Sequence, residues 1–339
     1  MKYLFELSKD HDLLPQAEVF SCLKAEQVDY KLVYSDKDII VIDSPASVKK
    51  IKTISERLSS VFFIDNFLFS CQPTSKKIRN LALKNNISEK GSMAVKYKNR
   101  SKNIASKSIV EILADVYTKD KEVNLEDPDI EIRAFITNSK VYVGIKLFKT
   151  NRTQFEDRKV QFRPYFSPIS LHPKIARILV NLSLIKKGEI LLDPFCGTGG
   201  ILLEAGLIGA KVVGSDIENK MIEGCKKTLD YYKIKNYDLL QLDVGDIAKN
   251  LDCVDAIVTD FPYGKSTTTK GEDMNKLYNR AFGSMAKVLK KNAILIAGLP
   301  KPELISLGKK YLKILNIYEL RVHGSLTRYF VVYKNDKYL

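Results

Sequence analysis

The sequence predicts an α/β protein whose C-terminal half is a mostly parallel, seven-stranded sheet with helices on both faces and an antiparallel hairpin at its end. Three observations predict this fold. Apolar strand patterns alternate with helical segments at a regular spacing, which is typical of parallel sheets. A glycine-rich turn follows the first strand of the series, and the last two strands are joined by a tight turn instead of a helix. The seven expected strands are 189–193, 211–216, 238–243, 256–260, 293–299, 312–322 and 327–333.

Two smaller α/β regions are expected before this half. Residues 1–60 alternate short strands with helical stretches, and 61–149 contain a basic strand, a helix that begins after Ser106 and a hairpin. Residues 150–165 are polar and are interpreted as a linker, and 166–339 form the last domain. A chain of 339 residues is long enough for two or three domains. Its 45% apolar and 28% charged residues argue against wholesale disorder.

Positive charge is concentrated in one part of the chain. The formal net charge is +15, and residues 76–107 contain ten Lys or Arg but one acid, Glu89. Such a cluster favours a nucleic-acid surface over a merely solvated face. The expected RNA-binding residues are Lys76, Lys77, Arg79, Lys96, Lys98, Arg100 and Lys102.

The cysteines exclude some classes of protein. The chain has five, widely spaced and without a C-x-x-C pair, so neither a disulfide framework nor a zinc site is expected. This usage fits a reducing cytoplasm. No targeting segment is expected at the charged start of the chain, and no run of about 18 apolar residues predicts a membrane span. We expect no metal, and nothing in the sequence requires a protein partner.

The segment 191–200, LLDPFCGTGG, is the strongest sign of a small-molecule site. A strand ends in Asp193, and Gly197 and Gly199 let the backbone approach a ligand closely. A dinucleotide fingerprint would need a third glycine where Leu202 stands. Asp193 would also repel a pyrophosphate. A ligand with a cationic amino-acid end suits this acid better, although a purely structural turn is the alternative.

The next two strands also end in acids. Asp216 is placed to accept hydrogen bonds from two ribose hydroxyls. Asp243 is placed to accept from an adenine amine, but Asp246 offers a second acid for that role. The alternative for either acid is a helix N-cap.

The fourth strand leads into a loop, 259–264 or TDFPYG, where a substrate would lie beside the cofactor. An exocyclic base amine is a poor nucleophile because its lone pair is delocalised into the ring. Asp260 and the backbone carbonyl of Phe261 can each accept an amine hydrogen bond and orient that lone pair. Pro262 shapes the turn, and Tyr263 can stack on the base. A proline-containing turn after a buried strand is the alternative interpretation.

These motifs resemble those of class I methyltransferases that methylate amines. The segment 163–177, RPYFSPISLHPKIAR, together with 193–200, is similar to the tRNA guanine-N2 methyltransferases that carry a THUMP domain, above all to the archaeal-type enzymes acting on guanosine 10. Residues 324–328, GSLTR, resemble their final hairpin, and 93–96, the helix after Ser106 and 123–133 resemble a THUMP domain behind a ferredoxin-like domain.

The resemblance implies a Rossmann-like methyltransferase domain at 166–339, a THUMP domain at 61–149 and a ferredoxin-like domain at 1–60. It implies that S-adenosylmethionine is the cofactor and tRNA the partner, held through the THUMP and ferredoxin-like domains. The implied catalytic loop is Asp260, Phe261, Pro262 and Tyr263. The implied cofactor residues are Phe166, Ser167, Ser170, Asp193, Gly197, Thr198, Gly199, Asp216, Ile217, Asp243 and Val244.

Some alternatives stay open at this point. The loop residues fit another tRNA position or ribosomal RNA equally well, and they do not distinguish one methyl transfer from two. A catalytically inactive RNA-binding protein is the alternative from a different class. The chain also departs from the family where Phe261 replaces the usual proline, which removes a fixed φ from the loop.

Overall fold

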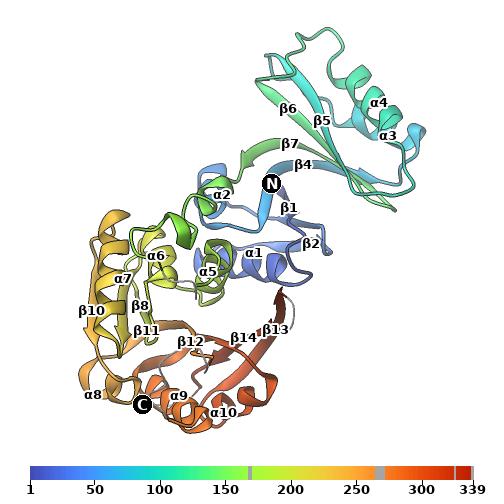
Figure 1. The fold of residues 1–339 in the computed structure, drawn as a ribbon. Coiled ribbons are helices and arrows are strands. Elements are labelled where there is room, and N and C mark those ends of the chain that lie inside the picture. Colours follow the sequence, from blue (N-terminus) through green and yellow to red (C-terminus); the bar gives the residue numbers. More distant parts are fainter. Residues whose placement is uncertain (167–169, 264–271, 324–325, 337–339) are drawn as a thin grey trace. The chain divides into compact units, whose positions relative to one another are not determined.

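The computed structural model describes residues 1–166, 170–263, 272–323 and 326–336 (Figure 1). It divides into two compact units. The N-terminal unit comprises residues 1–9, 29–55 and 61–150, and the C-terminal unit comprises 10–28, 56–60 and 151–339.

The N-terminal unit is built on one seven-stranded sheet in the order β2-β3-β1-β4-β7-β6-β5. Its pairs are antiparallel except for β5 and β6, which run parallel. The strands are β1 (Lys2–Leu7), β2 (Lys31–Ser35), β3 (Ile39–Asp43), β4 (Val61–Cys71), β5 (Met93–Asn99), β6 (Ile130–Ile136) and β7 (Val141–Lys149). Its helices are α2 (Val48–Arg57), whose last residues belong to the other unit, α3 (Ser75–Lys84) and α4 (Lys107–Tyr117).

The long strand β4 explains why two predicted regions share this sheet. It pairs with β1 on one side and with β7 on the other, so hydrogen bonds cross the expected boundary at residue 60. Helices α3 and α4 bury Ile78, Ile109 and Leu113 in a core with the β5–β7 end of the sheet. The domain boundaries predicted from the sequence stay a prediction. The two compact units of the structure have different bounds.

The C-terminal unit contains the second seven-stranded sheet, in the order β10-β9-β8-β11-β12-β14-β13. Its strands are β8 (Ile190–Asp193), β9 (Lys211–Asp216), β10 (Tyr237–Gln241), β11 (Val254–Asp260), β12 (Leu289–Leu299), β13 (Lys313–His323) and β14 (Leu326–Lys334). All pairs are parallel except those of β14, which lies antiparallel between β12 and β13. This confirms the predicted parallel sheet with a terminal hairpin.

Helices cover both faces of this sheet. Neighbouring residues of a strand point to opposite faces, and both faces carry apolar side chains that the helices bury. Leu191 packs with one layer of helices and Leu192 with the other. The first layer holds α1 (Leu14–Ala25), α5 (Pro173–Leu182), α6 (Gly200–Leu207) and α7 (Asn219–Tyr231). The second holds α8 (Ile247–Asn250), α9 (Met274–Val288) and α10 (Ile305–Lys309).

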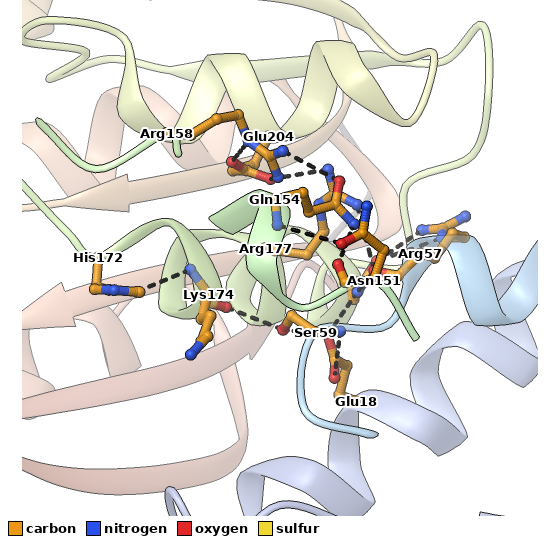
Figure 2. Close-up of polar contacts among 11 residues, drawn as sticks. Glu18, Arg57, Ser59, Asn151, Gln154, Arg158, His172, Lys174, Arg177 and Glu204 are labelled. Carbon is orange, nitrogen blue, oxygen red and sulfur yellow. Dashed lines mark hydrogen bonds and ion pairs between the residues drawn. The ribbon is translucent and has the colours of Figure 1, made fainter. Parts of the chain in front are cut away.

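A buried polar network joins distant segments within the C-terminal unit (Figure 2). Glu204 of α6 is fully buried and binds Arg158 and Arg177, each at 2.8 Å. Glu18 of α1 accepts hydrogen bonds from Ser59 and from Asn181 of α5. These contacts tie α1, residues 56–60 and the segment expected as a linker onto the first helix layer.

Candidate active site

A cavity of about 360 Å³ opens at the carboxyl ends of β8, β9 and β11. This is where ligands bind in parallel α/β sheets. The cavity brings together most residues that the sequence predicted for the site. Those that line it are Ser170, Asp193, Gly197, Thr198, Asp216, Ile217, Asp243, Val244, Asp260, Phe261, Pro262 and Tyr263.

Two predicted cofactor residues that the structure describes, Phe166 and Gly199, are not among those lining the cavity. Ser167 falls outside the described residues, and Phe166 is 61% exposed. Gly199 has a φ of +81° at the start of α6, and a Cβ there would lie 2.6 Å from Cys225 Sγ. Its glycine is therefore required by packing and backbone conformation. By contrast, a Cβ at Gly197 would meet nothing within 4 Å, which leaves open space for a ligand.

Asp193 is the last residue of β8 and lines the cavity as a buried acid. Its Oδ1 accepts hydrogen bonds from the Thr259 hydroxyl at 2.7 Å and the Phe195 amide at 3.2 Å. Burial raises the pKa of Asp193 to about 7. A cationic group nearby would favour the carboxylate form, which makes the residue a receptor for positive charge.

Asp216 ends β9 and shapes the glycine turn. Its two carboxylate oxygens accept from the amides of Gly197 at 3.1 Å and Glu218 at 3.0 Å. Burial raises the pKa of Asp216. The acid thus holds the turn in place, and each oxygen has further lone-pair capacity for a ligand hydroxyl.

The structure distinguishes the two acids that follow β10. Asp243 lines the cavity, caps a short helical turn through the Gly245 amide at 2.7 Å, and forms an ion pair with Arg280 of α9. Asp246 is 46% exposed in its side chain and binds Lys249 at 2.7 Å. Asp243 is therefore the acid that can face a ligand.

The predicted catalytic loop begins where β11 ends. Asp260 is mostly buried, the Tyr263 hydroxyl donates to its Oδ1, and Arg328 Nη2 lies 3.4 Å from its Oδ2. Burial raises the pKa of Asp260 to about 6. The guanidinium of Arg328 also lies 5.2 Å from the centre of the Tyr263 ring.

Phe261 shows how the loop is held without the family's proline. Its side chain is 1% exposed and packs on Phe195, Tyr278 and Phe282, with ring centres 5.2, 4.6 and 4.9 Å away. Its amide donates to the Gly298 carbonyl at 3.0 Å. The Tyr278 hydroxyl also donates to the carbonyl of Pro262. Aromatic packing and backbone hydrogen bonds thus fix the loop in place of a pyrrolidine ring.

Sequence reasoning missed several residues of this site. Glu218, Lys220, Met221, Glu272, Leu277 and Arg280 also line the cavity, and Arg328 contacts Asp260 from behind. Glu218 could have been found, since it stands two residues after Asp216. Arg280 and Arg328 come from distant elements, and no local spacing indicates that Arg280 lines the cavity or that Arg328 contacts Asp260.

The predicted RNA-binding residues differ in their availability. Lys76, Lys77, Lys98 and Lys102 are exposed. Arg79 is also exposed but lies 2.7 Å from Asp115, and Lys96 is 3.2 Å from Glu131.

Arg100 does not fit the expected role. Its side chain is 7% exposed, forms an ion pair with Asp38 and donates to the Leu7 carbonyl at 2.8 Å. It thereby ties β1 and the turn before β3 to the end of β5. We therefore leave Arg100 out of the RNA-binding surface.

Two features are absent from the described residues, a membrane-spanning helix and a metal site. No helix among them is long and apolar enough to cross a membrane. No group of three or more His, Cys, Asp or Glu side chains in the described part of the chain is arranged to hold a metal ion.

Comparison with known proteins gives consistent matches. A family model for an RMKL-like methyltransferase domain matches residues 161–329, and one for the THUMP domain matches 74–146. The tRNA (guanine(10)-N2)-dimethyltransferase of Methanothermobacter thermautotrophicus is 34% identical over 97% of this chain and 98% of its own. The enzyme of the same name from Methanocaldococcus jannaschii is 31% identical over 97% and 99%. Among solved structures, TrmN from Thermus thermophilus covers 98% of this chain and all of its own with a TM-score of 0.59 and 16% identity, which shows a shared fold.

Proposed function

Because the chain belongs to the family of the tRNA (guanine(10)-N2)-dimethyltransferases, we propose that it methylates the exocyclic N2 amine of guanosine 10 in tRNA with S-adenosylmethionine as donor. The observation that carries the proposal is the meeting of Asp193, Asp216, Asp243 and Asp260 around one cavity. Since both relatives are named dimethyltransferases, we propose two successive transfers to the same amine. A cytoplasmic location fits such a substrate.

The cavity has the donor and acceptor groups that the cofactor needs. Asp193 is a buried acid suited to the ammonium of the methionine end. The open space beside Gly197 would let the cofactor approach the backbone of the glycine turn. Asp216 would hold the ribose, and Asp243 the adenine amine. When bound there, the cofactor supplies an electrophilic sulfonium methyl group.

The residues of the loop would orient the nucleophile. The Asp260 carboxylate accepts one hydrogen bond from the guanine amine, and the Phe261 carbonyl accepts another, so that the nitrogen lone pair points toward the methyl group. Fixing two reactants in this way can lower a barrier by several kcal/mol. The acceptors also stabilise the positive charge that develops on nitrogen, and the Asp260 carboxylate would take up the amine proton that leaves once the N–C bond has formed. In the second transfer the monomethylated amine has one N–H left, which would donate to Asp260. With a pKa near 6, Asp260 is mostly ionised at neutral pH and can serve as acceptor.

The target base must leave its stack to reach the cavity, at a cost of a few kcal/mol. Phosphate contacts made elsewhere would offset that cost. The exposed lysines of the N-terminal unit, among them Lys77 and Lys98, would make such contacts. Ion pairs with tRNA phosphates would make binding strongly dependent on salt.

Substitution of Asp260 tests the proposed chemistry. We expect Asp260→Ala to lose methyl transfer to tRNA while tRNA and S-adenosylhomocysteine still bind, because the carboxylate acts on the amine. The measurement is transfer of a labelled methyl group from the cofactor, with binding followed by filter retention and calorimetry. Turnover close to that of the parent protein would contradict the assignment.

A further inference from the structure

Arg328 contacts the catalytic loop although it lies on a strand about seventy residues later in the chain. It lies on β14, and its side chain is 9% exposed. Its Nη2 is 3.4 Å from Asp260 Oδ2, and its guanidinium carbon is 5.2 Å from the centre of the Tyr263 ring. One side chain therefore contacts both Asp260 and the ring of Tyr263.

The strand between them leaves room for this contact. β12 separates β11 from β14, and Gly298 on β12 pairs with Asp260 on one side and with Phe330 on the other. A Cβ at Gly298 would collide with Asp260 Oδ1 and lie 3.2 Å from the Phe330 ring. The missing side chain lets the Asp260 carboxylate lean over β12 toward β14, where Arg328 meets it.

The groups that face Asp260 differ in charge and in their effect on its pKa. Tyr263 of the loop donates a hydrogen bond to it, Tyr278 of α9 and Asp193 of β8 lie nearby, and Arg328 of β14 supplies positive charge. Burial raises the pKa of Asp260, whereas Arg328 and the Tyr263 hydroxyl lower it. Loss of the guanidinium would leave the burial effect less opposed.

We propose that Arg328 is a positioning residue for methyl transfer: it holds the Asp260 carboxylate in its charged form, aimed at the substrate amine, and supports the Tyr263 ring from behind. The inference rests on the proposed role of Asp260 as hydrogen-bond acceptor. A protonated Asp260 has one carboxyl oxygen converted into an O–H donor, which faces the amine N–H as donor against donor. Transfer should therefore be lost as pH falls through the pKa of Asp260, and Arg328 sets where this happens.

The test is the pH dependence of single-turnover methylation of tRNA at saturating S-adenosylmethionine. For the parent protein we expect the rate to fall below about pH 6, following the pKa of Asp260. The acidic limb is the low-pH part of the plot of rate against pH. In Arg328→Met this limb should move to higher pH by about one to three pH units, because a cation within ~4 Å lowers a carboxyl pKa by that much. Arg328→Lys should keep its limb close to that of the parent, since the charge remains, but with a lower plateau.

The control is Arg321→Met on β13, the same substitution at an exposed arginine of the neighbouring strand. Its acidic limb should not move. A uniform loss of rate in Arg328→Met with an unmoved limb would overturn the inference and leave a merely structural role. If Arg328→Met does not fold, Arg328→Gln, which also removes the charge but keeps a polar side chain, takes its place, and an unmoved acidic limb in that variant would overturn the proposal. Absence of methylation by the parent protein would instead contradict the proposed function.

Discussion

Replacement of Phe261 by alanine should both destabilise the C-terminal unit and slow methyl transfer. The ring is 1% exposed and lies among Phe195, Tyr278 and Phe282, with centre-to-centre distances of 4.6–5.2 Å. The same residue carries the carbonyl proposed to orient the amine. Packing and chemistry are thus linked through a single backbone position.

The size of the effect follows from the burial. Truncation of a buried Phe to Ala costs about 3–5 kcal/mol, since contacts are lost and a cavity remains. For a unit of about 150–250 residues, each kcal/mol lowers the melting temperature by about 2–4 °C. The expected decrease is therefore roughly 6–20 °C. A loop displaced by about 1 Å would reduce the transfer rate by about 100-fold.

Thermal unfolding and single-turnover methylation measure the two effects. The transition of the C-terminal unit is identified by its upward shift with S-adenosylhomocysteine. Phe162→Ala is the matched control, because that ring is 58% exposed. Phe261→Leu should fall between the two, and Phe261→Pro should also lower the melting temperature because it empties the aromatic pocket. A melting temperature and rate for Phe261→Ala equal to those of Phe162→Ala would refute the reasoning.

Three further predictions address other parts of the molecule. Glu204→Ala should destabilise the C-terminal unit by about 3–5 kcal/mol in denaturant unfolding, because it leaves two buried guanidinium groups without their carboxylate; a loss below about 1 kcal/mol would show that the network is dispensable. Asp243→Ala should weaken S-adenosylhomocysteine binding by about 10-fold or more in calorimetry, because one hydrogen bond to a charged group is lost. Asp246→Ala should leave this binding unchanged, and equal losses in the two variants would contradict the assignment of Asp243 as the acid that contacts the cofactor. Joint replacement of Lys77 and Lys98 by alanine should weaken tRNA binding and reduce the slope of log K against log salt by about 0.7–0.9 per lost phosphate contact; a parallel loss of cofactor affinity would argue against separate roles for the two units.

Local patterns predicted those features that depend on neighbouring residues. The strand-helix alternation gave the parallel sheet, and acids at strand ends gave Asp193, Asp216 and Asp260, because the carboxyl ends of parallel strands meet at one edge. The choice between Asp243 and Asp246 could not be made, since both follow the same strand and only the turn decides which one faces the cavity.

The remaining features depend on contacts between distant segments. Arg328 contacts Asp260 across β12, where Gly298 leaves room for the contact. A run of basic residues does not reveal that Arg100 is buried against Asp38. From the sequence, Phe261 in place of proline predicts a less rigid catalytic loop. The sequence does not show that Phe195, Tyr278 and Phe282 surround the Phe261 ring. Such tertiary packing can replace a local backbone constraint without leaving a sequence motif.

Nucleoside mapping of methylated tRNA tests the central claim most directly. A tRNA transcript with guanosine at position 10 and a matched transcript with adenosine there would be incubated with the protein and S-adenosylmethionine, then digested and analysed by mass spectrometry. We predict N2-methylguanosine first and N2,N2-dimethylguanosine later in the first transcript, and neither in the second. Equal methylation of both transcripts, or a methyl group on any atom other than guanine N2, would contradict the account.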